Sequence, residues 1–167
     1  IVGTGYVGLV TALALAELGH RVVCLDVDEA KVERLRAGQA PFHEPGVDEL
    51  LARHAGRLTF TTDPATVFGA CPVVFVTVDT PPSPSGDADL SRVEAVVASI
   101  PPEAEVVMVM KSTVPAGTGR RIRQHLWATG RHGVRYVSNP EFLKAAKFAD
   151  AEKKATAFYA IAWAIPV

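Results

Sequence analysis

The sequence predicts an α/β fold: a doubly wound, mostly parallel six-stranded Rossmann sheet with helices on both faces, plus a C-terminal helix. Short runs rich in β-branched residues alternate along the chain with segments of helical periodicity. These runs are apolar at nearly every position, as is typical of strands that a parallel sheet buries on both faces. A chain of 167 residues is long enough to bury one such core, whereas a two-domain enzyme would be cramped.

The predicted elements follow one another in the order that βαβ units require. Strands are expected at residues 1–3, 21–26, 58–61, 73–78, 105–110 and 134–138. Helices are expected at residues 7–18, 29–37, 46–54, 90–99 and 117–128. The first strand is shorter than the usual length of about five or six residues, so we expect it to continue upstream of Ile1.

Turn residues separate these elements. Gly19 lies where the first helix needs a left-handed residue after its C-terminus, and Asp63 (followed by a proline) and Asp89 are typical helix starts. Residues 79–89, held extended by prolines, form the one long loop, which follows the end of a strand. Ligands of doubly wound sheets bind at the carboxyl ends of the strands, so this loop is predicted to face the site.

Composition and charge restrict the partners of the chain. Lys and Arg number 17 and Asp and Glu 18, a formal net charge of -1, so no general attraction to nucleic acid or anionic membranes is expected. Cys24 and Cys71 lie in apolar stretches, which favours a reducing cytosol over a disulfide framework. Residues 1–16 lack the basic start of a signal peptide, and the apolar tail 157–167 is too short to cross a bilayer. We therefore expect a cytoplasmic location and small-molecule partners.

The opening segment GTGYVG, residues 3–8, has the G-x-G-x-x-G spacing of a dinucleotide-binding turn. Gly3 would allow the tight turn, Gly5 would let a pyrophosphate approach the backbone, and Gly8 would let helix and strand pack closely. Asp26 ends the second strand, where its carboxylate can accept both hydroxyls of an adenosine ribose and repel a 2′-phosphate. The pattern thus favours NAD over NADP. In the alternative, the glycines only permit a turn and Asp26 only caps the next helix.

Four further motifs follow in order: FHEPGVDELL (42–51), VTVDTPP (76–82), KSTVPAGTG (111–119) and SNPEFLK (138–144). Together with GTGYVG they resemble the N-terminal NAD-binding domain of the UDP-glucose/GDP-mannose dehydrogenase family. The likeness covers residues 1–144, which we expect to form the Rossmann domain. Residues 145–167 are expected to form a divergent helical tail, either a remnant of the family's interdomain helix or a helix packed on the sheet edge or on another copy.

The resemblance implies oxidation of the C6 alcohol of a nucleotide sugar to a carboxylate with two NAD+, with UDP-glucose to UDP-glucuronate as the first expectation. It implies a nucleotide-sugar substrate and a homo-oligomer in the intact enzyme. In this family a cysteine thiolate holds the aldehyde until a thioester forms and is hydrolysed. Neither Cys24 nor Cys71 has a base or a glycine-rich loop beside it, so neither is predicted to be that nucleophile. The chain alone is expected to bind NAD without turnover.

The family's cofactor contacts can be carried over by motif. They fall on Gly3, Gly5, Tyr6, Val7, Gly8, Asp26, Lys31, Val78, Asp79, Thr80, Pro81, Ser112, Thr113 and Val114. The resemblance implies that the glycine turn lines the pyrophosphate, that Asp26 and Lys31 hold the adenosine ribose, and that residues 78–81 face the cofactor. Residues 112–114 would lie near its nicotinamide end.

The resemblance also implies catalytic and substrate residues. Thr113 and Glu141 resemble the pair that positions and activates water for thioester hydrolysis, which needs a nearby carboxylate base. Glu141, Phe142 and Leu143 would contact the substrate. The alternative for Glu141 is an acidic residue that stabilises a helix N-terminus. Ala145 stands where the family has a second glutamate that contacts cofactor and substrate, so that contact is not expected from this position.

Two other functions remain open at this point. A β-hydroxyacid or hydroxyacyl dehydrogenase shares the opening fingerprint but does not predict KSTVPAGTG followed by SNPEFL. A non-catalytic dinucleotide-binding or interaction module could use the tail 151–167 to recruit a partner. His20, His54, His125 and His132 show no metal-ligand spacing, so no metal is expected.

Overall fold

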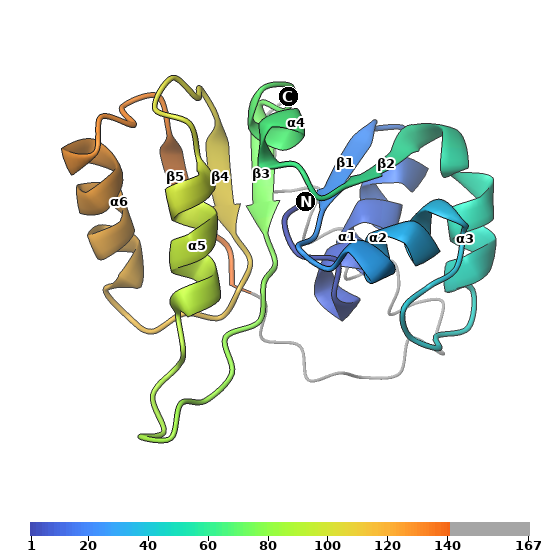
Figure 1. Cartoon of the computed structure of the whole chain (residues 1–167), viewed down its shortest axis with the longest axis horizontal. Coiled ribbons are helices and arrows are strands. Elements are labelled where there is room, and N and C mark those ends of the chain that lie inside the picture. The colour runs from blue at the N-terminus through green and yellow to red at the C-terminus, as the bar shows by residue number, and fades with distance from the viewer. Residues whose placement is uncertain (141–167) are drawn as a thin grey trace.

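The computed structural model describes residues 1–140, and all statements on structure below concern that part of the chain. Six α-helices, one 3-10 turn and five strands form there (Figure 1). The helices are α1 (Tyr6–Glu17), α2 (Glu29–Arg36), α3 (Val47–Arg53), α4 (Pro64–Phe68), α5 (Ser91–Ser99) and α6 (Thr118–Ala128), and the short turn is η1 (Ala55–Arg57). The strands are β1 (Val22–Leu25), β2 (Leu58–Thr61), β3 (Val73–Val76), β4 (Val107–Met110) and β5 (Arg135–Ser138).

All strand pairs are parallel, as predicted. β1 pairs with β2, while β3, β4 and β5 pair in that order. Residues 1–3 lie between these two groups, because Val2 makes parallel bridges to Leu25 of β1 and to Val76 of β3. Figure 1 shows the N-terminus at this place, between β1 and β3. The first predicted strand is therefore present only as bridges at Val2, and five of the predicted strands form as named strands in residues 1–140.

Hydrogen bonds hold residues 1–3 on both sides. On one side the Gly3 N–H donates to the Leu25 carbonyl and the Leu25 N–H donates to the Ile1 carbonyl, both at 2.8 Å. On the other side Val2 donates to Phe75 at 2.8 Å and accepts from Thr77 at 2.9 Å. This short segment thus has strand-like pairing with both neighbours.

Most of the local signals that separate the elements act as predicted, but Asp89 is not the N-cap of α5. Leu90 holds that position, and the Asp89 carboxylate accepts from the Ser91 N–H at 2.9 Å. The five helices expected from periodicity start and stop within one residue of their predicted bounds. Gly19 follows α1 with φ +96°, a left-handed conformation that favours glycine. Asp63 caps α4, since its carboxylate accepts from the N–H groups of Ala65 and Thr66 at 3.0 and 3.2 Å.

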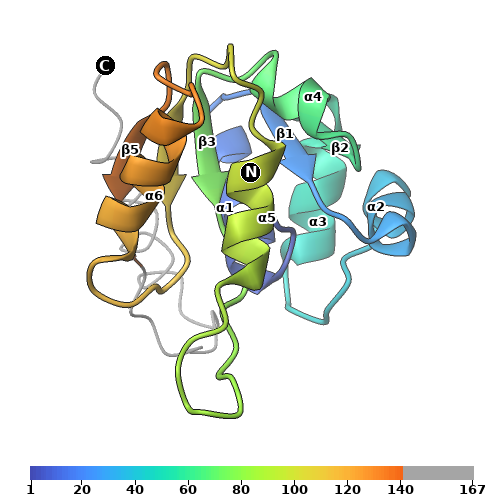
Figure 2. The ribbon, with the colours of Figure 1, turned by 60° about the vertical axis from the view of Figure 1, so that its left-hand side comes forward.

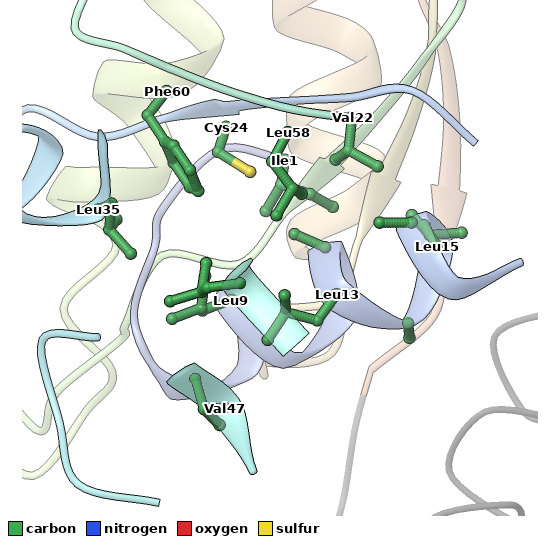
Figure 3. Packing of buried hydrophobic residues seen from close by; sticks show 14 of the residues in the cluster. Ile1, Leu9, Leu13, Leu15, Val22, Cys24, Leu35, Val47, Leu58 and Phe60 are labelled. Atoms are coloured by element: carbon green, nitrogen blue, oxygen red, sulfur yellow. The ribbon is translucent and has the colours of Figure 1, made fainter. Parts of the chain in front are cut away.

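The core divides into two clusters, because successive side chains of a strand point to opposite faces of the sheet. One cluster joins α1, α2 and α3 to strand residues such as Cys24 and Phe60 (Figure 3). The other joins α4, α5 and α6 to residues such as Leu25 and Met108. Figures 1 and 2 show α5 and α6 together on one side of β3, β4 and β5. The helices therefore pack in two groups, α1 to α3 in one cluster and α4 to α6 in the other.

Some predictions fall beyond this part of the chain. The C-terminal helix expected within residues 145–167 and the domain boundary at 144 lie outside the described residues. Within residues 1–140, no helix combines the length and the apolar character needed to span a bilayer.

Candidate functional site

The glycine turn after Val2 is built so closely that two of its glycines are required by the chain itself. Gly3 has φ +94°, and a Cβ there would lie 3.0 Å from the Val78 backbone nitrogen. A Cβ on Gly8 would lie 1.8 Å from the Gly3 carbonyl oxygen and 2.6 Å from Thr77 Oγ1. The first turn of α1 therefore packs directly against the backbone of the turn, which is the close approach expected of this motif.

Gly5 differs from the other two glycines because no contact within residues 1–140 requires a glycine there. Its φ of −69° is open to any residue, and a Cβ there would meet no atom within 4 Å. Gly5 is the N-cap of α1, where no side chain among residues 1–140 caps the helix, and the first turn carries no acidic residue. The positive end of the helix dipole thus faces an anionic ligand that approaches at Gly5.

Asp26 follows β1 and lies beside the glycine turn, with only 7% of its surface exposed. Its Oδ2 atom accepts from the Thr4 N–H at 2.8 Å, from Thr4 Oγ1 at 2.7 Å and from Lys31 Nζ at 2.9 Å. Its Oδ1 atom accepts from the Asp28 N–H at 3.1 Å. The carboxylate therefore has a fixed orientation next to the N-terminus of α1.

The surroundings of Asp26 keep its carboxyl group ionised. Burial by itself raises the pKa of this group, but the hydrogen bonds from Lys31, Thr4 and the Asp28 N–H outweigh burial and hold the pKa below its usual value. The alternative, in which Asp26 only caps the next helix, is wrong. Asp28 is the N-cap of α2, and its side chain accepts from the Lys31 N–H at 3.0 Å.

One hydroxyl group joins the glycine turn to the segment after β3, and two more join that segment to the one after β4. Thr77 Oγ1 donates to the Gly3 carbonyl at 2.7 Å, and Ser112 Oγ donates to the Val78 carbonyl at 2.6 Å. Thr80 Oγ1 donates to the carbonyl of Thr113 at 2.7 Å. These bonds bring the predicted residues after β3 and β4 together at the carboxyl edge of the strands, where ligands of such sheets bind.

The remaining predicted cofactor residues occupy more exposed places. Val7 is 37% exposed in the first turn of α1. Asp79 and Pro81 are exposed in the loop after β3, and the Asp79 carboxylate forms an ion pair with Arg92. Val78 and Val114 are half-buried against the cluster of α4, α5 and α6. Tyr6 stacks at a tilt on Phe42, with ring centroids 5.2 Å apart, which places the motif 42–51 beside the glycine turn.

The predicted catalytic pair is described only in part. Thr113 lies exposed after β4, with its carbonyl bound by Thr80. Glu141, Phe142 and Leu143 lie outside the described residues.

Both cysteines stand away from this edge. Cys24 is fully buried in β1, and burial raises the pKa of its thiol to about 11, so it is not a thiolate at neutral pH. Cys71 is half-buried before β3. No group of three or more His, Cys, Asp or Glu side chains that could hold a metal ion occurs in residues 1–140.

Two residues that matter for this geometry were absent from the predicted site. Thr4 orients Asp26, and Thr77 holds the Gly3 carbonyl. Each is a small polar residue within an apolar run, and each is buried, with 0% and 8% of its surface exposed. A single threonine within an apolar run could have indicated these contacts from the sequence, because a buried hydroxyl needs a hydrogen-bond partner.

The residues present fit an adenine dinucleotide. The space at Gly5 and the uncapped start of α1 suit a pyrophosphate. The Oδ1 atom of Asp26 accepts a single hydrogen bond within the described residues, so it can also accept from ribose hydroxyls.

Comparisons with known proteins agree with this geometry. Residues 1–154 match the model of the UDP-glucose/GDP-mannose dehydrogenase family, NAD binding domain. The chain is 41% identical over 150 residues to UDP-glucose 6-dehydrogenase TuaD of Bacillus subtilis and 46% identical over 151 residues to UDP-glucose 6-dehydrogenase of Rhizobium meliloti. Each match covers 86% of this chain but only 32% and 34% of these relatives. The chain thus spans about a third of the length of the curated relatives it matches.

Solved structures show the same fold. A UDP-glucose dehydrogenase from Pyrobaculum islandicum superimposes with a TM-score of 0.79 at 36% identity, over 99% of this chain and 44% of that one. A ternary complex of GDP-mannose dehydrogenase from Pseudomonas aeruginosa superimposes with a TM-score of 0.82 at 28% identity, over 98% of this chain and 43% of that one. The fold is therefore an α/β Rossmann-like fold.

Proposed function

The chain belongs to the UDP-glucose/GDP-mannose dehydrogenase family, and on that basis we propose that it is the NAD-binding portion of a UDP-glucose 6-dehydrogenase-like enzyme. The proposed reaction oxidises the C6 alcohol of a nucleotide sugar to a carboxylate with two NAD+, and UDP-glucose is the proposed substrate. Relatives whose names state this activity share 41% and 46% of the aligned residues with this chain. By itself the chain is proposed to bind NAD+ without turnover, because it spans about a third of those relatives.

The convergence of Gly5 and Asp26 at one edge is the observation that carries this proposal. Gly5 lies at the N-terminus of α1, and its neighbour Thr4 binds and orients the carboxylate of Asp26. The helix N-terminus and the oriented carboxylate therefore lie side by side. A pyrophosphate needs the first feature and a ribose with free hydroxyls needs the second. The ionised carboxylate also supports NAD+ over NADP+, because it repels a 2′-phosphate.

The bound dinucleotide would supply a hydride acceptor, and the chain's own residues would bind and orient it. Gly3, Gly5 and Gly8 would line the pyrophosphate, together with Tyr6 and Val7 of the first turn. Asp26 would accept from the ribose hydroxyls, with Lys31 beside it. Residues 78–81 would face the cofactor and residues 112–114 would lie near its nicotinamide end, and bonds from Thr80 and Ser112 already join the two segments.

Hydrolysis of the proposed thioester requires a water molecule held near a carboxylate base. We propose Thr113 and Glu141 for this role and Glu141, Phe142 and Leu143 for contact with the substrate. The support is the motif SNPEFLK and the position of Thr113 at the edge where the cofactor segments meet.

We further propose that residues 1–3 form the first strand of a six-stranded, doubly wound sheet in the order β2, β1, residues 1–3, β3, β4 and β5. The support is the pairing of Val2 with both β1 and β3. The intact enzyme is proposed to be a cytoplasmic homo-oligomer, as the family resemblance implies.

The first test is a calorimetric titration of the 167-residue chain with NAD+. We expect saturable binding that Asp26→Ala weakens by about tenfold or more, because the variant loses a charged acceptor for the ribose. Glu103→Ala is the matched control, since this exposed carboxylate lies in the turn before β4, away from the glycine turn. Equal binding by the Asp26 variant, or no binding at millimolar NAD+, would contradict the proposal.

A second measurement concerns turnover. The purified chain is incubated with UDP-glucose and NAD+ while NADH absorbance is followed. We expect no steady production of NADH, because neither cysteine is suited to be the nucleophile. Steady production would show that the chain contains a complete active site.

A further inference from the structure

Thr4 occupies the variable position between Gly3 and Gly5, and its surroundings suggest a role beyond the turn. Its side chain is fully buried. It gives both of its donors to one atom, since its N–H and its hydroxyl lie 2.8 and 2.7 Å from Asp26 Oδ2. Lys31 Nζ is the third donor to this oxygen, at 2.9 Å. Asp26 Oδ2 is thus fully engaged within the chain.

The other oxygen of Asp26 has a different environment. Oδ1 accepts only the Asp28 N–H within the described residues, at 3.1 Å. A carboxylate oxygen can accept more than one hydrogen bond, so Oδ1 has capacity for a ligand donor. Because three donors hold Oδ2, the carboxylate cannot rotate without breaking them. The three donors to Oδ2 therefore leave Oδ1 as the oxygen that faces a ligand.

We propose that Thr4 is a positioning residue for cofactor selectivity, whose hydroxyl aims Asp26 Oδ1 at the ribose hydroxyls of NAD+ and keeps Lys31 engaged with Oδ2. This inference rests on the proposed function, because it assigns the selectivity of the same site. Lys31 is a cation whose side chain is 27% exposed, and it could otherwise attract the 2′-phosphate of NADP+. Thr4 would thus act on the cofactor only through Asp26.

Removal of the hydroxyl should affect the two cofactors differently. In Thr4→Val the carboxylate keeps its two backbone donors but loses the hydroxyl bond that fixes its rotation and holds Oδ2 toward Lys31. NAD+ then loses part of a directional hydrogen bond to its ribose. NADP+ carries a phosphate at the 2′ position and does not gain from that bond, so its affinity should change less. The ratio of the two affinities therefore reports on positioning, whereas general damage to the site lowers both affinities together.

The test measures dissociation constants for NAD+ and NADP+ with wild-type chain, Thr4→Val and Thr4→Ser. We expect Thr4→Val to weaken NAD+ binding by about three- to tenfold and to lower the preference for NAD+ by a similar factor. Thr4→Ser keeps the hydroxyl and should retain both the affinity and the preference of the wild type. An unchanged preference in Thr4→Val, or failure of Thr4→Ser to restore it, would overturn the proposal.

Two controls keep the outcome clear. Thermal unfolding without cofactor shows whether each variant is folded. If Thr4→Val does not fold, Thr4→Ala and Thr4→Ser form a second pair that differs by one hydroxyl, and the same loss of preference is expected in the alanine variant. Failure of the wild-type chain to bind NAD+ would overturn the proposed function and this inference together. Normal wild-type binding with an unchanged ratio in the variants would overturn the inference alone.

Discussion

The proposed cofactor site has two ends that differ in how they are built. At one end, which we call the ribose end, Thr4 and Asp26 are buried and hold each other through bonds of 2.7 and 2.8 Å. At the other, the loop end, Ser112 is buried, but Asp79 is exposed and so is the bond from Thr80 to the Thr113 carbonyl. The comparison indicates that the ribose end is part of the folded core, whereas the contact between Thr80 and Thr113 at the loop end lies at the surface.

This difference separates the effects that substitutions should have. A change at the ribose end should alter stability and cofactor binding together, because the same side chains serve both. A change at the loop end should alter binding with little effect on stability, because exposed hydrogen bonds are exchanged for bonds to water. Three substitutions test this division.

The largest effect is expected for Gly8→Ala. A Cβ at this position would lie 1.8 Å from the Gly3 carbonyl oxygen, so α1 must move away from the turn. We expect a loss of about 3 kcal/mol or more in the free energy of unfolding, measured by urea denaturation, together with loss of NAD+ binding.

Gly5→Ala is its matched control. A Cβ on Gly5 meets no atom within 4 Å, so the free energy of unfolding should change by less than about 1 kcal/mol while NAD+ binding is lost. Normal stability in Gly8→Ala would contradict the close packing of α1 on the turn.

An intermediate effect is expected for Asp26→Asn, and it should depend on pH. The pKa of Asp26 in the folded chain lies below its usual value, so its ionised form stabilises the fold at all pH values above about 4. This contribution is lost as the pH falls through the lowered pKa. We therefore expect Asp26→Asn to destabilise the chain at pH 7 and to flatten the fall in stability below about pH 4.

The measurement is urea unfolding of both proteins at a series of pH values. Glu103→Gln, at an exposed position, controls for the general effect of one charge. A wild-type profile as flat as that of Asp26→Asn in acid would show that the bonds from Thr4 and Lys31 do not favour the ionised form.

The smallest effect on stability is expected for Thr80→Val, at the loop end. This substitution removes the bond from Thr80 Oγ1 to the Thr113 carbonyl. The bond is exposed, so the free energy of unfolding should fall by less than about 1 kcal/mol. NAD+ affinity should fall by about threefold or more if the two segments face the cofactor.

Thr129→Val is the comparison for this test, because it removes an exposed hydroxyl bond to the His125 carbonyl at the end of α6. It should leave NAD+ affinity unchanged. A large loss of stability in Thr80→Val would mean that the loop end belongs to the core as much as the ribose end does.

The sequence predicted much of this architecture because its signals are local. Helical periodicity and single residues such as Gly19 and Asp63 set the bounds of the helices. The glycine spacing likewise identified the turn, since Gly3 and Gly8 pack against each other within a few residues and leave no room for a Cβ on Gly8.

The rest of the site depends on contacts between distant segments. Thr4 meets Asp26 across 22 positions and Thr77 meets Gly3 across 74, and no periodicity encodes either pair. The predicted six-strand count stays a prediction, because residues 1–3 pair on both sides without forming a named strand. The ion pair of Asp79 with Arg92 was not foreseen either, since the two residues come together only when the long loop turns back to α5.

The position of Val2 has a consequence for how the domain folds. β3, β4 and β5 can assemble through neighbouring βαβ units, and β1 and β2 can do the same, but residues 1–3 must then join the two groups. That step closes a long stretch of chain, as the 74 positions between Gly3 and Thr77 show, and long-range closure slows folding. The amide hydrogens of Val2 and Thr77 form bonds between residues 1–3 and the group of β3, β4 and β5. They should therefore exchange with solvent only when the two groups of strands separate, which makes them reporters of the cooperativity of the whole domain.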